Sequence, residues 1–162
     1  MTYDTTKELA ARAVARLIET GKTLATAESC TGGLIAARVT DVPGCSAVFL
    51  GGCVTYQNEI KIALLGVDPA AIDAHTEVSY EVARQMARGA RARLGAALAV
   101  SATGFAGPGG GTPENPAGTV YIALATADGE QAWRLSLGDI GREAVREGVA
   151  AEVFRKILEE LG

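Results

Sequence analysis

A serine and a cysteine follow a short apolar segment in the first fifth of the chain. Residues 23–27 have the composition of a buried strand, and Glu28, Ser29, Cys30, a threonine and two glycines come directly after it. Residues 34–39 are apolar and compatible with a helix, so the sequence predicts a strand-to-helix turn with Ser29 at its apex. Ligands of open α/β sheets bind at the carboxyl ends of strands and at the helix N-termini that follow. We therefore expect a site at this turn.

A tyrosine and a lysine follow the next strand-like segment. Residues 47–56 have strand composition and end at Tyr56, and Lys61 lies in the first turns of a helix expected to begin near Asn58. A serine hydroxyl needs a base to act as a nucleophile, and with one histidine in the chain the available base is a neutral lysine amine. Burial and the positive potential of a helix N-terminus both favour the neutral amine. If the two strands are neighbours, Ser29, Tyr56 and Lys61 meet.

Simpler interpretations compete with this one. An isolated Ser29 is most often a helix cap, Cys30 a small buried side chain, and Lys61 a lysine that reaches water. Glu28 is interpreted as a partner of neighbouring groups or a charge at the strand end rather than as an acid catalyst. The Tyr-x-x-x-x-Lys spacing is one residue longer than that of short-chain dehydrogenases, and no dinucleotide fingerprint is present, so that class is excluded.

A glycine-rich segment, residues 103–118, is the second candidate site. It follows residues 96–102, which have the pattern of a fully buried strand. It lacks the Lys-Ser/Thr pair of a Walker A loop, and no G-x-G-x-x-G opens a helix there. Its main-chain N–H groups could cradle a phosphate or an oxyanion, and a purely structural loop is equally compatible with the sequence.

Helices and strands alternate along the chain. Thr5 or Thr6 can cap a first helix that Gly21 ends, Ser79 can cap another that runs to Leu94, and a last helix is expected over residues 141–161. Residues 119–125 and 131–137 flank an Asp-Gly turn and predict an antiparallel hairpin. The pattern predicts an α/β fold, a three-layer α/β/α sandwich with a mixed, mostly parallel sheet of about five strands. A length of 162 residues fits a single domain over residues 1–162.

Composition removes several functional classes. The net charge is −4, so nucleic-acid binding is not expected, and four arginines between residues 84 and 93 are interpreted as a solvated helix face. Residues 1–8 lack the features of a leader, and no apolar stretch is long enough to span a membrane, so a soluble, cytoplasmic protein without membrane contact is expected. Three cysteines without C-x-x-C spacing and a lone His75 suit neither a disulfide framework nor a metal site.

Four motifs together resemble one family. TAESCTGG (residues 26–33), VTYQNEIK (54–61), TGFAGPGG (103–110) and PAGTV (116–120) occur in the order and with the compact spacing of the CinA C-terminal-domain family. The resemblance covers nearly the whole chain. It implies the α/β/α sandwich of that family, and the activity of its nicotinamide-nucleotide amidohydrolases, which hydrolyse the carboxamide of nicotinamide mononucleotide to nicotinate mononucleotide and ammonia.

The resemblance also assigns roles to residues. It implies Ser29 as the nucleophile, which gives its proton to Lys61 directly or through Tyr56, with no cofactor and no metal. The residues expected to bind the substrate or its oxyanion are Thr31, Gly32, Gly33, Thr103, Gly104, Gly107, Gly109 and Arg142. Phe105 and Asn115 depart from the residues common in the family. We expect the N-terminal domain of full-length CinA proteins to be absent here, so functions of that half are not carried over.

A second hypothesis comes from another class of protein. The chain could be a nucleotide-sensing or interaction module that keeps the pocket without turnover, as domains of this family linked to competence or DNA damage are expected to do. The presence of all three residues, Ser29, Tyr56 and Lys61, favours the enzyme. The expected partner is a small-molecule nucleotide, and the protein is expected to be a homo-oligomer, with a dimer favoured.

Overall fold

Twelve short elements make up the fold in the computed structural model, which describes residues 3–162 and only the backbone of residues 3 and 4. The segment predicted to carry no leader therefore lies partly outside the described residues. In chain order the elements are α1 (Tyr3–Thr20), β1 (Leu24–Glu28), α2 (Leu34–Thr40), the 3-10 turn η1 (Cys45–Ala47), β2 (Phe49–Val54), α3 (Asn58–Leu65), α4 (Pro69–His75), α5 (Tyr80–Leu94), β3 (Leu98–Gly104), β4 (Thr119–Thr126), β5 (Gly129–Ser136) and α6 (Arg142–Leu161).

The five strands form one mixed sheet in the order β2-β1-β3-β4-β5. β1 runs parallel to both β2 and β3, whereas β4 is antiparallel to β3 and β5 is antiparallel to β4. The predicted hairpin of β4 and β5 is confirmed. The predicted mixed sheet of five strands is confirmed, but it is not mostly parallel, since two of its four strand pairs are antiparallel. The segment between β3 and β4 holds no helix, whereas parallel connections usually do.

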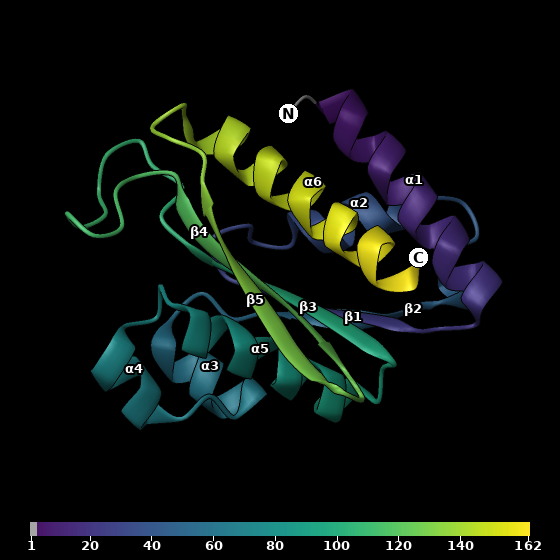
Figure 1. The fold of residues 1–162 in the computed structure, drawn as a ribbon, viewed down its shortest axis with the longest axis horizontal. Helices are drawn as coiled ribbons and strands as arrows, with labels where there is room; N and C mark the ends of the chain where they lie inside the picture. The colour runs from purple at the N-terminus through teal and green to yellow at the C-terminus, as the bar shows by residue number, and fades with distance from the viewer. Residues whose placement is uncertain (1–2) are drawn as a thin grey trace.

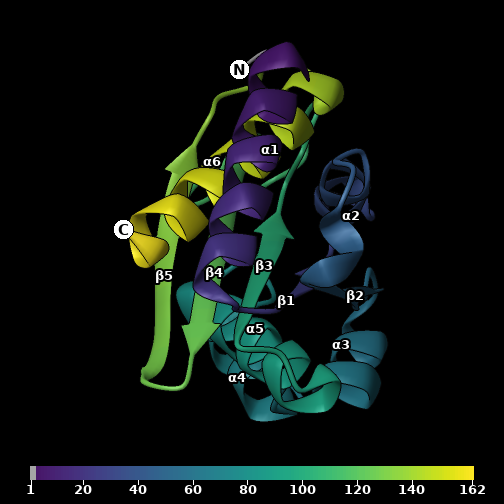
Figure 2. The same ribbon diagram turned by 90° about the vertical axis from the view of Figure 1, so that its right-hand side faces the viewer.

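Helices cover both faces of the sheet. Figure 1 shows α1, α2 and α6 on one side and α3, α4 and α5 on the other, and Figure 2 shows β2 and β5 at the two edges. Two apolar clusters fill the interior on the two sides of β1 and β3, one with Leu17 and Phe154, the other with Met86 and Leu65. Burial of these side chains is the main term that stabilises the fold.

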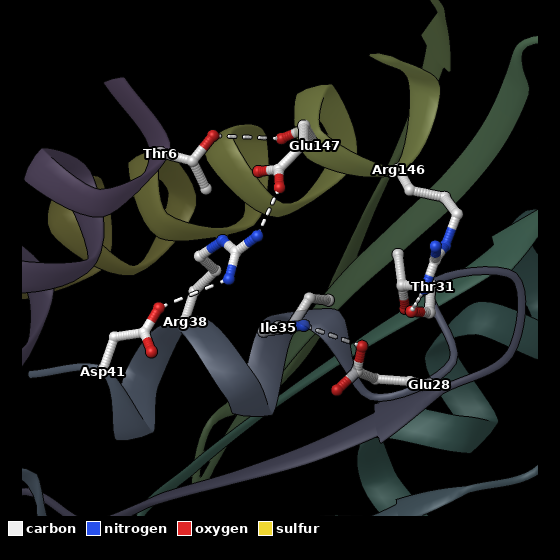
Figure 3. Close-up of polar contacts among 8 residues, drawn as sticks. All are labelled: Thr6, Glu28, Thr31, Ile35, Arg38, Asp41, Arg146 and Glu147. Atoms are coloured by element: carbon white, nitrogen blue, oxygen red, sulfur yellow. Dashed lines mark hydrogen bonds and ion pairs between the residues drawn. The ribbon is translucent and has the colours of Figure 1, made fainter. Parts of the chain in front are cut away.

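Polar contacts also tie α1, α2 and α6 together. Arg38 of α2 forms an ion pair of 2.5 Å with Glu147 of α6 and one of 3.3 Å with Asp41 (Figure 3). The hydroxyl of Thr6 donates to the main-chain carbonyl of Glu147 at 3.4 Å. The prediction that Thr5 or Thr6 caps α1 is wrong, since this helix already begins at Tyr3.

The carboxyl ends of the three parallel strands lie at one edge of the sheet. Glu28, the last residue of β1, pairs in register with Val54 of β2 and Ala102 of β3. The segments that follow these strands therefore start side by side, although they are far apart in the sequence. Among the described residues, no helix combines the length and apolar character that crossing a membrane requires.

Candidate active site

The turn after β1 is held by main-chain and carboxylate hydrogen bonds. The N–H of Ser29 donates to the carbonyl of Ala102 at 3.0 Å, and the N–H of Gly32 donates to the carbonyl of Ser29 at 3.0 Å. Gly32 and Gly33 adopt φ values of 59° and 103°, which glycine reaches without strain. These two glycines let the chain reverse sharply into α2 and leave Ser29 at the apex, as the sequence predicts.

The buried carboxylate of Glu28 caps α2 from the strand side. Its Oε1 accepts from the N–H groups of Gly33 at 3.2 Å and Ile35 at 2.9 Å, and its Oε2 accepts from that of Ala36 at 3.0 Å (Figure 3 draws the bond to Ile35). A carboxylate at this place satisfies N–H groups of the first turn that have no partner within the helix and complements the helix dipole. Glu28 is thus a structural partner of the turn that carries Ser29.

Lys61 reaches Ser29 through the interior. Its side chain extends from α3 and is fully buried, and its Nζ lies 3.0 Å from Ser29 Oγ. Nζ also donates to the carbonyls of Thr55 at 2.9 Å and Tyr56 at 3.0 Å. No carboxylate lies within ion-pair distance of this ammonium in the described part of the chain. The sequence prediction that Ser29 and Lys61 meet is therefore matched by the geometry.

The environment of Lys61 favours a neutral amine. Burial lowers its pKa from the ordinary 10.5, and the negative charge of Glu77 opposes part of this change. A neutral amine has two N–H bonds and one lone pair. When the two N–H bonds point to the carbonyls of Thr55 and Tyr56, the lone pair is left to accept the hydroxyl proton of Ser29. The three contacts together suit a general base.

Tyr56 takes part through its main chain. Its carbonyl accepts from Lys61 Nζ and, at 3.5 Å, from Ser29 Oγ, whereas the residue as a whole is 59% exposed. Tyr56 borders the pocket beside Ser29, and every hydrogen bond that joins Tyr56 to Ser29 or Lys61 in the described residues uses the main-chain oxygen. The geometry favours direct proton transfer between Ser29 and Lys61 over transfer through the phenol.

Cys30 is next to the serine but is poorly suited to act as a nucleophile. Burial raises the pKa of its thiol to about 12, with a further rise from the charge of Glu28 and opposing effects from its own main-chain N–H, Arg146 and Lys61. The thiolate, not the thiol, is the reactive form. At neutral pH, Cys30 is therefore a half-buried thiol that borders the pocket, and it forms no disulfide.

Two adjoining cavities open at this end of the sheet. The first, about 250 Å³, is bordered by Ser29, Thr103 and Glu77. The second, about 240 Å³, is bordered by the glycine-rich segment and Arg142. Four residues border both, namely Cys30, Tyr56, Gly104 and Phe105. The two cavities form one elongated site, in which Ser29 borders one half and Arg142 borders the other.

The predicted binding residues occupy different parts of this site. Gly104, Gly107 and Gly109 border the cavity of Arg142, whose guanidinium donates to the carbonyl of Gly107 at 2.8 Å. The hydroxyl of Thr103 is already used, since it donates to the carbonyl of Glu77 at 2.8 Å. Predicted residues Thr31, Gly32 and Gly33 lie in the turn after Ser29, and they are not among the residues that border either cavity.

Two residues near the site escaped the sequence-based prediction. Arg146 lies one turn after Arg142 on α6 and donates to the carbonyl of Thr31 at 2.7 Å, which braces the turn (Figure 3). The four-residue spacing of the two arginines, which places them on one helix face, was the available signal. Glu77 borders the serine half of the site from the segment before α5, and no pattern in the sequence pointed to it.

Metal binding finds no support among residues 3–162, where no group of three or more histidine, cysteine, aspartate or glutamate side chains could hold an ion. His75 is half exposed at the end of α4, 3.9 Å from Glu81. It is not among the residues that border either half of the site.

Fold and site together define an α/β protein with a buried serine–lysine pair in a pocket at the carboxyl ends of its parallel strands. The chain belongs to the CinA family, since the model of the CinA C-terminal domain matches residues 6–161. It is 60% identical over 110 residues to a CinA-like protein of Chlorobaculum tepidum, covering 68% of this chain and 26% of that protein. It is 45% identical over 146 residues to a protein of Shewanella oneidensis named nicotinamide-nucleotide amidohydrolase PncC, covering 90% of this chain and 34% of that protein.

Solved structures show the same fold. The competence/damage inducible protein CihA of Agrobacterium tumefaciens superposes with a TM-score of 0.92 at 40% identity, covering 97% of this chain and 95% of that one. A CinA superfamily protein of Escherichia coli gives the same TM-score at 28% identity, with 99% and 93% covered. The chain spans about a third or less of the length of the two curated relatives above, whereas these solved structures match it almost end to end.

Proposed function

We propose that this protein hydrolyses the carboxamide of nicotinamide mononucleotide to nicotinate mononucleotide and ammonia, in pyridine nucleotide salvage. The observation that carries the proposal is the 3.0 Å contact between Lys61 Nζ and Ser29 Oγ, in which the lysine is fully buried. The name of the Shewanella oneidensis relative supports the choice of substrate. The elongated site supports it too, because the substrate has a reactive amide at one end and a phosphate at the other.

Acylation is the first half of the reaction. Ser29 Oγ attacks the carboxamide carbon while Lys61 Nζ takes the hydroxyl proton. The tetrahedral intermediate collapses when the bond between carbon and nitrogen breaks, and Lys61 returns the proton to the departing nitrogen, which leaves as ammonia. Serine then carries the nicotinate mononucleotide as an ester.

Deacylation reverses the roles of the groups. Water attacks the ester carbon and gives a proton to Lys61 Nζ. Lys61 returns this proton to Ser29 Oγ as the ester bond breaks, so the enzyme is regenerated and nicotinate mononucleotide leaves. Acylation and deacylation each use Lys61 once as a base and once as an acid. This requires an amine whose pKa is below that of an ordinary lysine.

Main-chain N–H groups of the turn are the proposed oxyanion donors. Cys30 borders both halves of the site, and in the described part of the chain its N–H has no main-chain acceptor, unlike those of Ser29 and Gly32. A well-placed donor of this kind contributes about 3 kcal/mol to the transition state. In the other half of the site, Arg142 has the forked donors that suit a phosphate, and the N–H groups of the glycine-rich segment add to them.

Ammonia release tests the proposal. Purified protein incubated with nicotinamide mononucleotide is expected to release ammonia, and Ser29→Ala is expected to lower kcat at least about a thousandfold because no other nucleophile is activated. Cys30→Ala is the matched control and should keep kcat within about threefold, since the thiol stays protonated. Intact, folded protein that releases no ammonia contradicts the proposal, and loss of activity in the cysteine variant alone means that the nucleophile is Cys30.

A nucleotide-binding module without turnover is the competing hypothesis. Calorimetric binding of nicotinamide mononucleotide without any product would favour it. The buried, desolvated Lys61 speaks for the enzyme, because a binding site needs no lysine with a lowered pKa beside a serine.

A further inference from the structure

Glu77 has no part in the mechanism above, although it borders the same half of the site as Ser29. It lies between α4 and α5, directly after Thr76, which has a φ of 65°. A β-branched residue in this region of φ is strained. Thr76 is the one residue other than glycine with positive φ among residues 3–162.

Hydrogen bonds from three side chains fix this strained turn. The hydroxyl of Thr76 bonds with the main chain of Val78 at 3.3 Å, and the hydroxyl of Ser79 donates to the carbonyl of Thr76 at 2.8 Å. The buried hydroxyl of Thr103, from the end of β3, donates to the carbonyl of Glu77 itself. The backbone of Glu77 is therefore held in one place relative to the strand ends that carry the site.

The carboxylate of Glu77 is only loosely engaged. Its Oε2 accepts from Asn58 Nδ2 at 3.5 Å, and no cation lies within 4.0 Å of it among the described residues. Its charge acts on Lys61, whose pKa it raises, and so it works against the neutral base that the mechanism needs. A negative charge at this place lowers the fraction of Lys61 that is neutral, and we look for its role toward the substrate or the product.

We propose that Glu77 is the residue by which the site distinguishes a carboxamide from a carboxylate. Its carboxylate accepts the N–H groups of the substrate amide and repels the carboxylate of the product, which the protonated form of Lys61 otherwise retains. The inference rests on the proposed function. In this proposal, the strained turn at Thr76 holds the charge of Glu77 beside the reacting group.

Equilibrium binding to an inactive protein tests this role. In the Ser29→Ala protein, which binds without turnover, the dissociation constants of nicotinamide mononucleotide and nicotinate mononucleotide are measured by calorimetry, with and without Glu77→Gln. Glutamine keeps the size and an amide oxygen that accepts hydrogen bonds, but it removes the charge. The ratio of the product constant to the substrate constant is expected to fall about tenfold, since one like-charge repulsion in a partly solvated pocket is lost. Glu81→Gln, on the exposed side of α5, should leave the ratio unchanged.

Other outcomes distinguish failure of the inference about Glu77 from failure of the proposed function. If both ligands bind more weakly by the same factor in Glu77→Gln, the residue holds the ribose or phosphate common to both, and the inference is wrong. An unchanged ratio also overturns it, while ammonia release by the native protein shows that the proposed function still stands. If the native protein releases no ammonia and neither nucleotide binds, both proposals fail together.

Discussion

Two basic side chains with little exposure, Arg38 and Lys61, have different kinds of partner. Arg38, between α2 and α6, has a side chain that is 13% exposed and is paired with the carboxylate of Glu147 at 2.5 Å. Lys61, under the carboxyl ends of the strands, is fully buried and has a hydroxyl and two carbonyls as partners. The first cation is matched by an opposite charge, and the second is matched by dipoles only.

This difference separates a structural pair from a reactive group. A buried ion pair keeps both charges, and removal of one partner leaves the other charge buried and unpaired. A buried amine with neutral partners relieves the same desolvation cost by losing its proton, and then it can serve as a base. Replacement of each basic side chain by methionine is therefore expected to have opposite consequences. At Lys61 activity is lost, and at Arg38 stability is lost.

The largest effect is expected for Lys61→Met, which removes the amine but keeps an unbranched side chain. It should lower kcat for nicotinamide mononucleotide at least about a thousandfold, since Ser29 loses its base. The free energy of unfolding should fall by at most about 2 kcal/mol. The hydrogen bonds to two carbonyls are lost, but the polar amine no longer has to be buried, and this gain offsets part of the loss. Ammonia assays and urea denaturation measure the two quantities. A large loss of stability with retained activity would make Lys61 a structural residue.

Arg38→Met is expected to show the reverse pattern. It should lower the free energy of unfolding by about 3–5 kcal/mol, because Glu147 is left buried without its partner, while kcat stays within about threefold. A second substitution, Glu147→Met, should restore most of the stability. Arg88→Met, which breaks the exposed pair of Arg88 with Glu130, is the control and should change stability by less than about 0.5 kcal/mol. Equal losses of stability in the Arg38 and Arg88 variants would show that the pair of Arg38 with Glu147 stabilises the protein no more than an exposed pair does.

The smallest effect is expected in the pH dependence. Because burial lowers the pKa of Lys61 below the ordinary 10.5, kcat/KM should rise with pH as the amine loses its proton and level off below pH 10.5. Between the two pKa values the unfolded chain binds more protons than the folded one, so Lys61 makes the free energy of unfolding rise with pH in that window. Below the lowered pKa, Lys61 is protonated in both the folded and the unfolded chain, so its contribution to the free energy of unfolding no longer changes with pH. Lys61→Met should lack this rise, and identical slopes in both proteins would contradict a lowered pKa.

Much of the serine–lysine pair could be predicted from the sequence because strand ends are local features. Ser29 follows one strand, Lys61 lies just after the next, and parallel neighbours place both at one edge of the sheet. The boundaries were off by a residue, since β1 spans Leu24–Glu28 instead of residues 23–27. That shift puts Glu28 inside the strand, where its carboxylate reaches the N–H groups of α2.

Other features depend on contacts that no local pattern encodes. The position of Glu77 results from a strained threonine and from a hydroxyl of β3 that is 26 residues away. The partner of Arg38, Glu147, is 109 residues away. The antiparallel direction of β4 was within reach of the sequence, because the glycine-rich connection before it has no helical pattern and parallel crossovers are usually helical.

Trapping of the acyl-enzyme tests directly whether Ser29 is the nucleophile. Protein mixed with nicotinamide mononucleotide is quenched in acid, digested, and the peptides are weighed by mass spectrometry. We expect a nicotinate mononucleotide ester on Ser29, absent from the Ser29→Ala protein. The same adduct on Cys30 would contradict it, as would rapid ammonia release by a protein that never carries an acyl group.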